Sequence, residues 1–331
     1  MRKLTFLLCC TVMILIFCQT GFSAVTRLKI GSNRLGTSFY VQGATVADVV
    51  TKNNDIGLEI EAMPIAGGVG NITLIEQNKT LDFALTMNNN AMWAINGICG
   101  FDEKATNIRA LLGGLDRYFV GVMVRSDLGI SSLDDIAKKK PKLNFYTQEK
   151  GSTAEKIASQ VLEACGLTYE SIEQFGGSVH FTDAEAITNA FKDGYCDVFV
   201  LNINKGHPVI TEIALTGKLS FISFSEPELK FLNDKYGFIP TTLPAGTFDG
   251  QDKDIPTGGS STMIIAPKVM SDEIAYAITK AVAENKDSLI KGHKAFSDFD
   301  PAEAADENFN GTVPLHPGAE KYFKEKNLLK Q

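Results

Sequence analysis

The stretch KIGSNRLGTSFYVQGATVADVV, residues 29–50, begins at the end of a short apolar run and continues with helical periodicity. Gly31 and Gly36 have the spacing of a phosphate-binding loop, but Thr37 occupies the place of its lysine. That lysine carries the charge that reaches the terminal phosphates, so its absence argues against a nucleotide. A glycine-rich turn before a helix still offers backbone N–H groups to an anion. The stretch therefore predicts a strand, turn and helix that can hold a small anion.

Short apolar runs alternate with amphipathic stretches over residues 28–112, and the alternation starts again at residue 118. This pattern is typical of an α/β fold with a largely parallel sheet, and its restart indicates a second α/β lobe. After Phe238 the sequence becomes rich in Pro, Gly and Asp before it returns to an apolar strand at Thr262–Ala266. We therefore expect a signal peptide at 1–24, a first lobe at 25–116 plus 241–331, and a second lobe at 117–240.

Export is predicted from the first 24 residues, in which Arg2 and Lys3 precede an apolar run from Leu4 to Cys18. The run is shorter than the roughly 20 residues of a spanning helix, as in a Sec-type signal peptide. We therefore expect a periplasmic protein. Without Arg2 and Lys3, 30 of the 32 basic residues remain against 39 acidic ones, a net charge of about −9. Such a charge repels phosphate backbones and excludes nucleic acid as a partner.

Signals for catalysis are missing. Outside the predicted leader the cysteines are Cys99, Cys165 and Cys196, which allow at most one disulfide, and the sequence leaves its pairing open. The four histidines have no metal-ligand spacing, and no nucleophile elbow is present. We therefore predict a protein that is not an enzyme, without metal or cofactor. An enzyme with Cys99 or Cys196 as its nucleophile is the alternative.

The segments that follow the predicted strands are mostly small, polar and uncharged. Ligands of open α/β sheets bind beyond the carboxyl ends of the strands, so these segments mark the expected site. Any one of them can equally be a helix cap, but five that converge favour a binding site for a small polar or anionic ligand. They are GSNRLGTS (31–38), AGGVGN (66–71), NNN (88–90), TQEKGST (147–153) and NINKGHP (202–208).

Charged and aromatic side chains near these segments add candidates. Arg34 and Arg117 can pair with a carboxylate, Arg117 in bidentate geometry, and Lys150 can do the same. Each can instead be a solvated surface residue. Tyr40 can donate its hydroxyl to a ligand or pack, and Trp93 can be core or a stacking wall. Asn88 and Asn202 offer amides from the third and fifth segments.

Several of these motifs occur in one order along the whole mature chain and resemble the TAXI family, the substrate-binding proteins of TRAP transporters. The resemblance implies a periplasmic-binding-protein fold of type II-like topology, with two lobes joined by hinge strands that close on a ligand. The motifs are IGSNRLGTSFYVQGATVADVV (30–50), AGGVGNITLIEQNKTLDFAL (66–85), KGSTAEKIASQVLEACGL (150–167), DGYCDVFVLNINKGHPVI (193–210), LPAGTFDGQDKDIPTGG (243–259) and LHPGAEKYFKEKNLL (315–329).

The resemblance also implies binding residues and partners. Family ligands lean towards glutamate and related dicarboxylates such as 2-oxoglutarate, and the membrane subunits of a TRAP transporter receive them. We expect a monomer with this role; a receptor that passes the ligand signal to a sensor kinase is the alternative. The positions carried over by motif are Gly36, Thr37, Ser38, Tyr40, Gly68, Asn71, Ser152 and Thr153.

Overall fold

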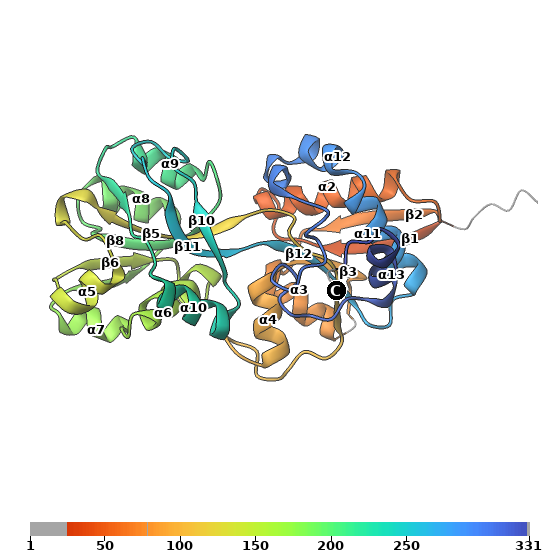
Figure 1. The fold of residues 1–331 in the computed structure, drawn as a ribbon, viewed down its shortest axis with the longest axis horizontal. Coiled ribbons are helices and arrows are strands. Elements are labelled where there is room, and N and C mark those ends of the chain that lie inside the picture. The colour runs from red at the N-terminus through yellow and green to blue at the C-terminus, as the bar shows by residue number, and fades with distance from the viewer. Residues whose placement is uncertain (1–24, 78, 330–331) are drawn as a thin grey trace, which may run out of the picture.

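The computed structural model describes residues 25–77 and 79–329, so the predicted signal peptide lies outside the described residues. Two α/β lobes lie side by side along the long axis of the molecule (Figure 1). The N-terminal and C-terminal parts of the chain together form lobe I, and the middle of the chain forms lobe II (Figure 1). No helix in the described ranges is long and apolar enough to cross a membrane.

Lobe I contains a five-stranded sheet in the order β2-β1-β3-β12-β4. The pairs β1–β2 and β1–β3 are parallel, whereas β12 runs antiparallel to both β3 and β4 because it enters from lobe II. The strands are β1 (Thr26–Gly31), β2 (Leu58–Met63), β3 (Phe83–Met87), β4 (Ile108–Leu112) and β12 (Thr262–Pro267).

Helices cover both faces of this sheet, and apolar clusters fill the space on each side. One face is covered by α2 (Ser38–Lys52), α11 (Asp272–Ala283), α12 (Lys286–Gly292), η2 (Lys294–Asp298) and α13 (Pro317–Glu325), and the other by α3 (Gly67–Glu76) and α4 (Asn88–Asn96).

Lobe II contains a seven-stranded sheet in the order β10-β11-β5-β8-β6-β7, with β9 also paired to β5. Only β6–β7 and β6–β8 are parallel among its pairs, so this sheet is mixed rather than largely parallel. The strands are β5 (Tyr118–Arg125), β6 (Asn144–Thr147), β7 (Ser178–Phe181), β8 (Val198–Ile203), β9 (Leu219–Phe221), β10 (Ile239–Leu243) and β11 (Ile255–Ser260).

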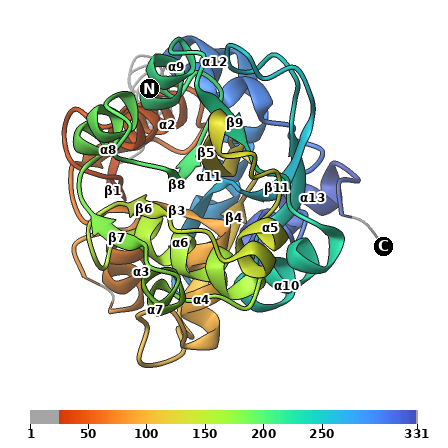
Figure 2. The ribbon, with the colours of Figure 1, turned by 90° about the vertical axis from the view of Figure 1, so that its left-hand side faces the viewer.

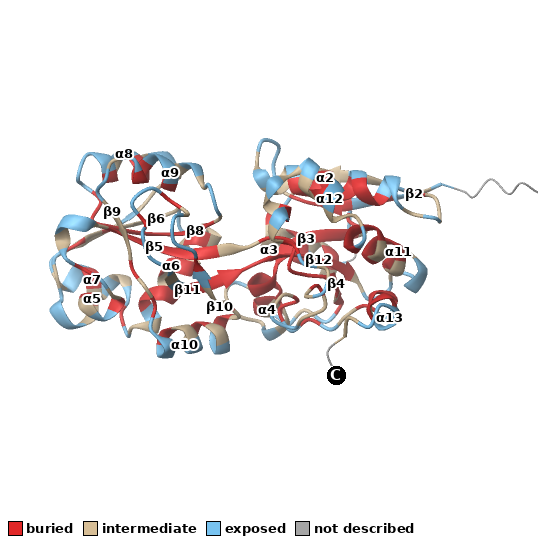
Figure 3. Cartoon of the chain, turned by 45° about the horizontal axis from the view of Figure 1, so that its top comes forward, coloured by how far each residue is buried: buried red, intermediate tan, exposed pale blue. Residues whose placement is uncertain are grey.

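The helices of lobe II also lie on both faces of its sheet, as the end-on view shows (Figure 2). In both lobes the central strands are buried, whereas β2, β7 and β9 are mostly half-buried or exposed, and the outward faces of the helices are exposed (Figure 3). The helical segments of this lobe are η1 (Ser126–Leu128), α5 (Leu133–Lys139), α6 (Thr153–Ala164), α7 (Tyr169–Gln174), α8 (Ala184–Lys192), α9 (Pro208–Ala214) and α10 (Glu226–Tyr236).

Helix α6 shows how closely some elements follow the sequence. The Ser152 side chain accepts a hydrogen bond from Glu155 N and caps the helix, and Gly166, just beyond its end, has a φ of 72°. Between them Ile157 and Val161 face the core at 0 % and 1 % exposure. The cap, the apolar face and the terminating glycine of α6 thus all coincide with local signals in the sequence.

The chain passes between the lobes twice, from β4 to β5 and from β11 to β12. The predicted return to lobe I at residue 241 is wrong, because β10 and β11 pair with each other and β11 pairs with β5 of lobe II. The segment rich in Pro, Gly and Asp therefore forms β10, β11 and the loop that joins them, all within lobe II. By sheet membership, lobe II therefore extends to Ser260.

Candidate ligand-binding cleft

A cavity of about 230 Å³ lies between the lobes, with walls from both. Its position agrees with the expectation that facing strand ends form the site, since most of its residues follow β1, β3, β6 and β8 or begin α3 and α6. The lining residues are Asn33, Phe39, Gly68, Met87 and Asn90 from lobe I, and Tyr118, Gln148, Thr153, Ala154, Leu201, Asn202 and His207 from lobe II.

Two helices begin at the cavity wall, one from each lobe. Gly68 lies in the first turn of α3 and Thr153 is the first residue of α6. The first turn of a helix leaves backbone N–H groups without intrahelical acceptors and carries a partial positive charge. A Cβ on residue 68 would lie 2.8 Å from Asn90 Nδ2, so glycine keeps this wall open. The two helix starts can therefore face one anionic group from opposite sides.

The lining is uncharged and combines polar with apolar side chains. None of the described residues that line the cavity is Lys, Arg, Asp or Glu; the polar groups are four carboxamides, the Thr153 hydroxyl, the Tyr118 phenol and the His207 imidazole. Burial lowers the pKa of His207 and raises the pKa of Tyr118, so both favour their neutral forms. The lining therefore offers hydrogen-bonding groups and helix ends, not charged side chains, to any ligand.

Three lining residues carry a buried polar atom without a hydrogen-bond partner. These atoms are Asn90 Oδ1, Asn202 Oδ1 and His207 Nδ1. Asn90 is only 2 % exposed, so water does not solvate its amide freely. Buried polar atoms are nearly always hydrogen-bonded in folded proteins. The residues that carry these three atoms line one cavity, but the atoms themselves have almost no accessible surface, and similar atoms occur elsewhere in the described residues.

Among the residues predicted from the sequence, the structure brings Gly68, Thr153 and Asn202 into the lining. Ser152 lies next to this group as the N-cap of α6. Whether any of them contacts a ligand stays a prediction.

The predicted residues of the first loop flank the cavity without lining it. Thr37 Oγ1 donates to Arg34 O at 2.7 Å and accepts from Tyr40 N at 3.2 Å, so it caps α2. Ser38 Oγ lies 2.9 Å from His293 Nε2 within lobe I. Gly36 provides the turn with a φ of 85°, and the Arg34 side chain is exposed.

Three further predicted residues make contacts within the protein. Asn71 is fully buried, and its Nδ2 donates to Ser32 O and Leu85 O at 2.8 Å each, which joins β1 to β3. Asn88 Oδ1 accepts from Ser261 N at the crossing between lobes. Arg117 pairs with Glu303 at 2.8 Å and lies 4.0 Å from the centre of the Phe309 ring.

Except for Tyr118 at the start of β5, the lining residues that were not predicted sit inside or beside the same five segments. Asn33, Asn90, Gln148 and His207 belong to quoted segments, whereas Phe39, Met87, Ala154 and Leu201 are direct neighbours of quoted residues. The sequence therefore indicated which segments of the chain line the cavity. Which side chain of a segment faces the cavity depends on the twist of the strand and the first helical turn.

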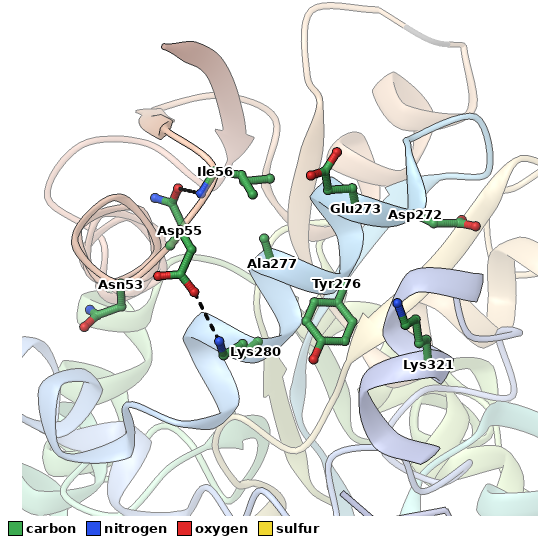
Figure 4. Close-up of a pocket in the computed structure, with 10 residues that line it drawn as sticks. Asn53, Asp55, Ile56, Asp272, Glu273, Tyr276, Ala277, Lys280 and Lys321 are labelled. Atoms are coloured by element: carbon green, nitrogen blue, oxygen red, sulfur yellow. Dashed lines mark hydrogen bonds and ion pairs between the residues drawn. The ribbon is translucent and has the colours of Figure 1, made fainter. Parts of the chain in front are cut away.

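A second hollow of about 330 Å³ lies on lobe I alone, between the end of α2 and α11 (Figure 4). Its walls carry charged side chains, and the Asp55–Lys280 ion pair spans it at 3.2 Å (Figure 4). Lys321 lies 5.3 Å from the centre of the Tyr276 ring beside it. Because lobe II contributes nothing to this hollow, a movement of the lobes leaves it unchanged.

The cysteines lack the surroundings of a nucleophile. All three described cysteines are free thiols, and burial raises the pKa of each, that of Cys165 to about 12. Nucleophilic cysteines need the opposite shift. Within residues 25–77 and 79–329, no group of three or more His, Cys, Asp or Glu side chains is arranged to hold a metal ion.

A model of the NMT1-like family matches residues 30–326. The chain belongs to this family. A TctC solute-binding protein from Polaromonas, solved without ligand, matches with 16 % identity and a TM-score of 0.56 over 92 % of this chain and 98 % of its own. MatC from Rhodopseudomonas palustris with bound malate matches with 12 % identity and a TM-score of 0.51, over 92 % of this chain and 99 % of its own.

PhnD1 from Prochlorococcus marinus, in complex with methylphosphonate, matches with 14 % identity and a TM-score of 0.50, over 92 % of this chain and 99 % of its own. These likenesses confirm the predicted two-lobed periplasmic-binding-protein fold. The Polaromonas protein is named a solute-binding protein, and the other two were solved with the small anions malate and methylphosphonate.

Proposed function

We propose that this protein is an exported receptor of the TAXI type, which captures a small carboxylate-bearing solute and delivers it to the membrane subunits of a TRAP transporter. The observation that carries the proposal is the cavity between the lobes, whose walls bring the starts of α3 and α6 together. In this assignment Gly68, Thr153 and Asn202 contact the solute.

The chemistry of the walls suits the capture of one acid group. A carboxylate between the lobes can accept hydrogen bonds from the N–H groups of the first turns and from the Thr153 hydroxyl. It would compensate the positive ends of two helices at once. Malate and methylphosphonate, bound by two proteins of the same fold, are also small anions and support this class of solute.

Closure follows from the same arrangement. A solute that contacts lobe I at Gly68 and lobe II at Thr153 gains more contacts when the lobes are close than when they are apart. Its binding therefore shifts the protein towards the closed form by this difference in contacts. The membrane subunits would then distinguish a loaded receptor from an empty one by its shape.

Titration of the mature protein with small carboxylates tests the proposal, with binding read by calorimetry and by the shift in melting temperature. Thr153→Val should weaken binding by roughly 1 to 3 kcal/mol, because a buried solute oxygen loses its donor. Thr73→Val is the matched control, since Thr73 is exposed on α3 and does not line the cavity. If no carboxylate bound, or if both variants lost affinity equally, the proposal would be wrong.

A further inference from the structure

Helix α4 belongs to lobe I by its place in the chain but contributes to the cores of both lobes. It follows β3 without a loop, and its Ala91 and Ala94 are buried in an apolar cluster of lobe I. Trp93 of the same helix is fully buried among lobe II residues, and Phe101, beyond the helix end, packs against both clusters. Besides the two crossings of the chain, a third, non-covalent connection therefore joins the lobes.

Hydrogen bonds fasten this connection to two helices of lobe II. The indole N–H of Trp93 donates to Tyr236 O, at the end of α10, at 2.9 Å. Beyond the end of α4, Cys99 O accepts from Lys156 Nζ of α6 at 2.6 Å. Gln160 Nε2, one turn further along α6, lies 3.3 Å from Cys99 Sγ. The whole length of α4 and the turn after it are thus held against lobe II.

Asn88, the first residue of α4, ties the connection to a crossing of the chain. Its side chain is fully buried, and its Oδ1 accepts from Ser261 N at 2.9 Å, between β11 and β12. Its Nδ2 donates to Gly237 O of lobe II at 3.2 Å and to Asn308 O of lobe I at 2.9 Å. One amide therefore bonds to both lobes and to a crossing, and a buried amide is costly to leave unpaired.

The connection lies across the crossings from the Lys205–Asp298 ion pair. Lys205 precedes α9, and Asp298 ends η2, just after α12. Figures 1 and 2 both place α9 and α12 at one edge of the molecule and α4 and α10 at the other, with the crossing strands between them. A rotation about the crossings that parts the ion pair would press α4 into lobe II, and a packed core is hardly compressible. The axis of opening must therefore lie close to α4.

The alternative is that Trp93 leaves lobe II when the lobes part. Exposing a tryptophan that is 0 % accessible would disfavour the open form by a factor of roughly a hundred or more. Because a solute enters through the open form, its capture would become slower by a similar factor. A contact that persists avoids this cost.

We infer that α4 is the pivot of the two lobes: the contact that Trp93 and Asn88 make with lobe II stays intact while the cleft opens. The inference rests on the proposed function, which requires the lobes to move, and adds where the movement is centred. Displacements between the lobes are small at α4 and α10 and grow towards α9 and α12.

Trp93 is the only tryptophan of the chain, so its fluorescence reports on this contact alone. Lys205→Cys with Asp298→Cys places two thiols across the cleft, which a short bis-methanethiosulfonate linker joins and dithiothreitol releases. Cys99→Ser, added to this variant, keeps the linker away from the contact under test. Small-angle X-ray scattering reports whether release parts the lobes, and acrylamide quenching reports whether water reaches Trp93.

On release we expect a larger radius of gyration and an unchanged emission maximum. Acrylamide quenching should stay within about twofold of the cross-linked value, because a side chain that remains packed is shielded in both forms. Protein unfolded in guanidinium gives the values for exposed Trp93. Lys192→Cys with Glu212→Cys, in the same Cys99→Ser protein, is the matched control, because it replaces an exposed ion pair within lobe II. Its release should change neither the scattering nor the fluorescence.

The outcomes separate this inference from the proposed function. A red shift and faster quenching of Trp93 on release would overturn the inference, and so would lobes that stay together once the linker is removed. These measurements use no solute. A failure of the proposed function would instead appear as the absence of carboxylate binding in the titrations, whatever Trp93 reports.

Discussion

The two ends of the cleft are held together in different ways. At the hinge, buried Asp116 accepts hydrogen bonds from Thr262 N at 2.7 Å and from Thr262 Oγ1 at 2.8 Å, and Ser261 Oγ donates to Asp116 O. At the far end, which we call the mouth of the cleft, Lys205 of lobe II pairs with Asp298 of lobe I at 3.0 Å. The side chains of that pair are 49 % and 28 % exposed, whereas Asp116 is 1 % exposed.

This difference in burial separates the fixed part of the molecule from the part that can open. Water competes for an exposed ion pair, so such a pair contributes little, whereas a buried hydrogen bond is costly to lose. We therefore expect the hinge to persist through opening and closing. The solute, rather than the Lys205–Asp298 pair, should supply most of the free energy that keeps the cleft shut.

The largest expected effect is at the hinge end, where α4 of lobe I inserts Trp93 into the core of lobe II. Trp93 is fully buried, and its indole N–H donates to Tyr236 O at 2.9 Å. Trp93→Ala should lower the free energy of unfolding by about 3 to 5 kcal/mol, because a large cavity opens where the lobes meet. Denaturant unfolding followed by circular dichroism measures it. Met92→Ala, a partly exposed neighbour, should cost clearly less; equal costs would contradict this role for Trp93.

The next effect concerns pH at the same end. Burial raises the pKa of Asp116 to about 6, against the hydrogen bonds from Thr262 and the nearby Arg117 charge. The folded protein therefore holds this proton more tightly than the unfolded chain, in which an aspartate has a pKa of 3.8. From this group alone, stability should rise by roughly 3 kcal/mol as the pH falls from above 6 to below 4.

Asp116→Asn keeps the shape of the side chain and removes its titration, so it isolates this contribution. When the free energy of unfolding is measured between pH 4 and 7, its dependence on pH should be smaller in the variant by the contribution of Asp116. At pH 7 the variant should be more stable than the wild-type protein. An unchanged slope would show that Asp116 is ionised in the folded protein at the lower pH. Asp298→Asn, at the exposed end of the cleft, serves as the control.

The comparison of hinge and mouth also shows which features the sequence could predict. Local signals were sufficient for α6, whose cap, apolar face and stop glycine lie within 15 residues of one another. Sheet membership of β10 and β11 was missed, because β10 pairs only with β11, and the pairing of β11 with β5 joins residues more than 130 positions apart. The roles of Arg117 and Asn88 depend on Glu303 and Ser261, which are equally distant along the chain. Long-range partners of this kind leave no periodicity in a single sequence.

A smaller effect is expected for Thr37, in the loop of lobe I between β1 and α2. Because Thr37 Oγ1 is already bonded to Arg34 O and Tyr40 N, Thr37→Val should lower stability by about 1 kcal/mol through loss of the helix cap. The sequence had suggested that this hydroxyl binds the solute, which would weaken binding instead. Melting curves with and without saturating solute separate the two roles. A loss of affinity without a loss of stability would assign Thr37 to the solute.

The smallest effect is expected at the mouth. Lys205→Ala removes the ion pair with Asp298 and should change the free energy of unfolding by less than about 1 kcal/mol. Because the pair joins the lobes only when they are close, its loss should instead speed solute release, by no more than about fivefold at low salt and less at high salt. Stopped-flow dissociation measures this rate. The exchange of the two charges, Lys205→Asp with Asp298→Lys, should restore the slower release. A large loss of stability in Lys205→Ala would instead show that the mouth contributes as much to stability as the hinge.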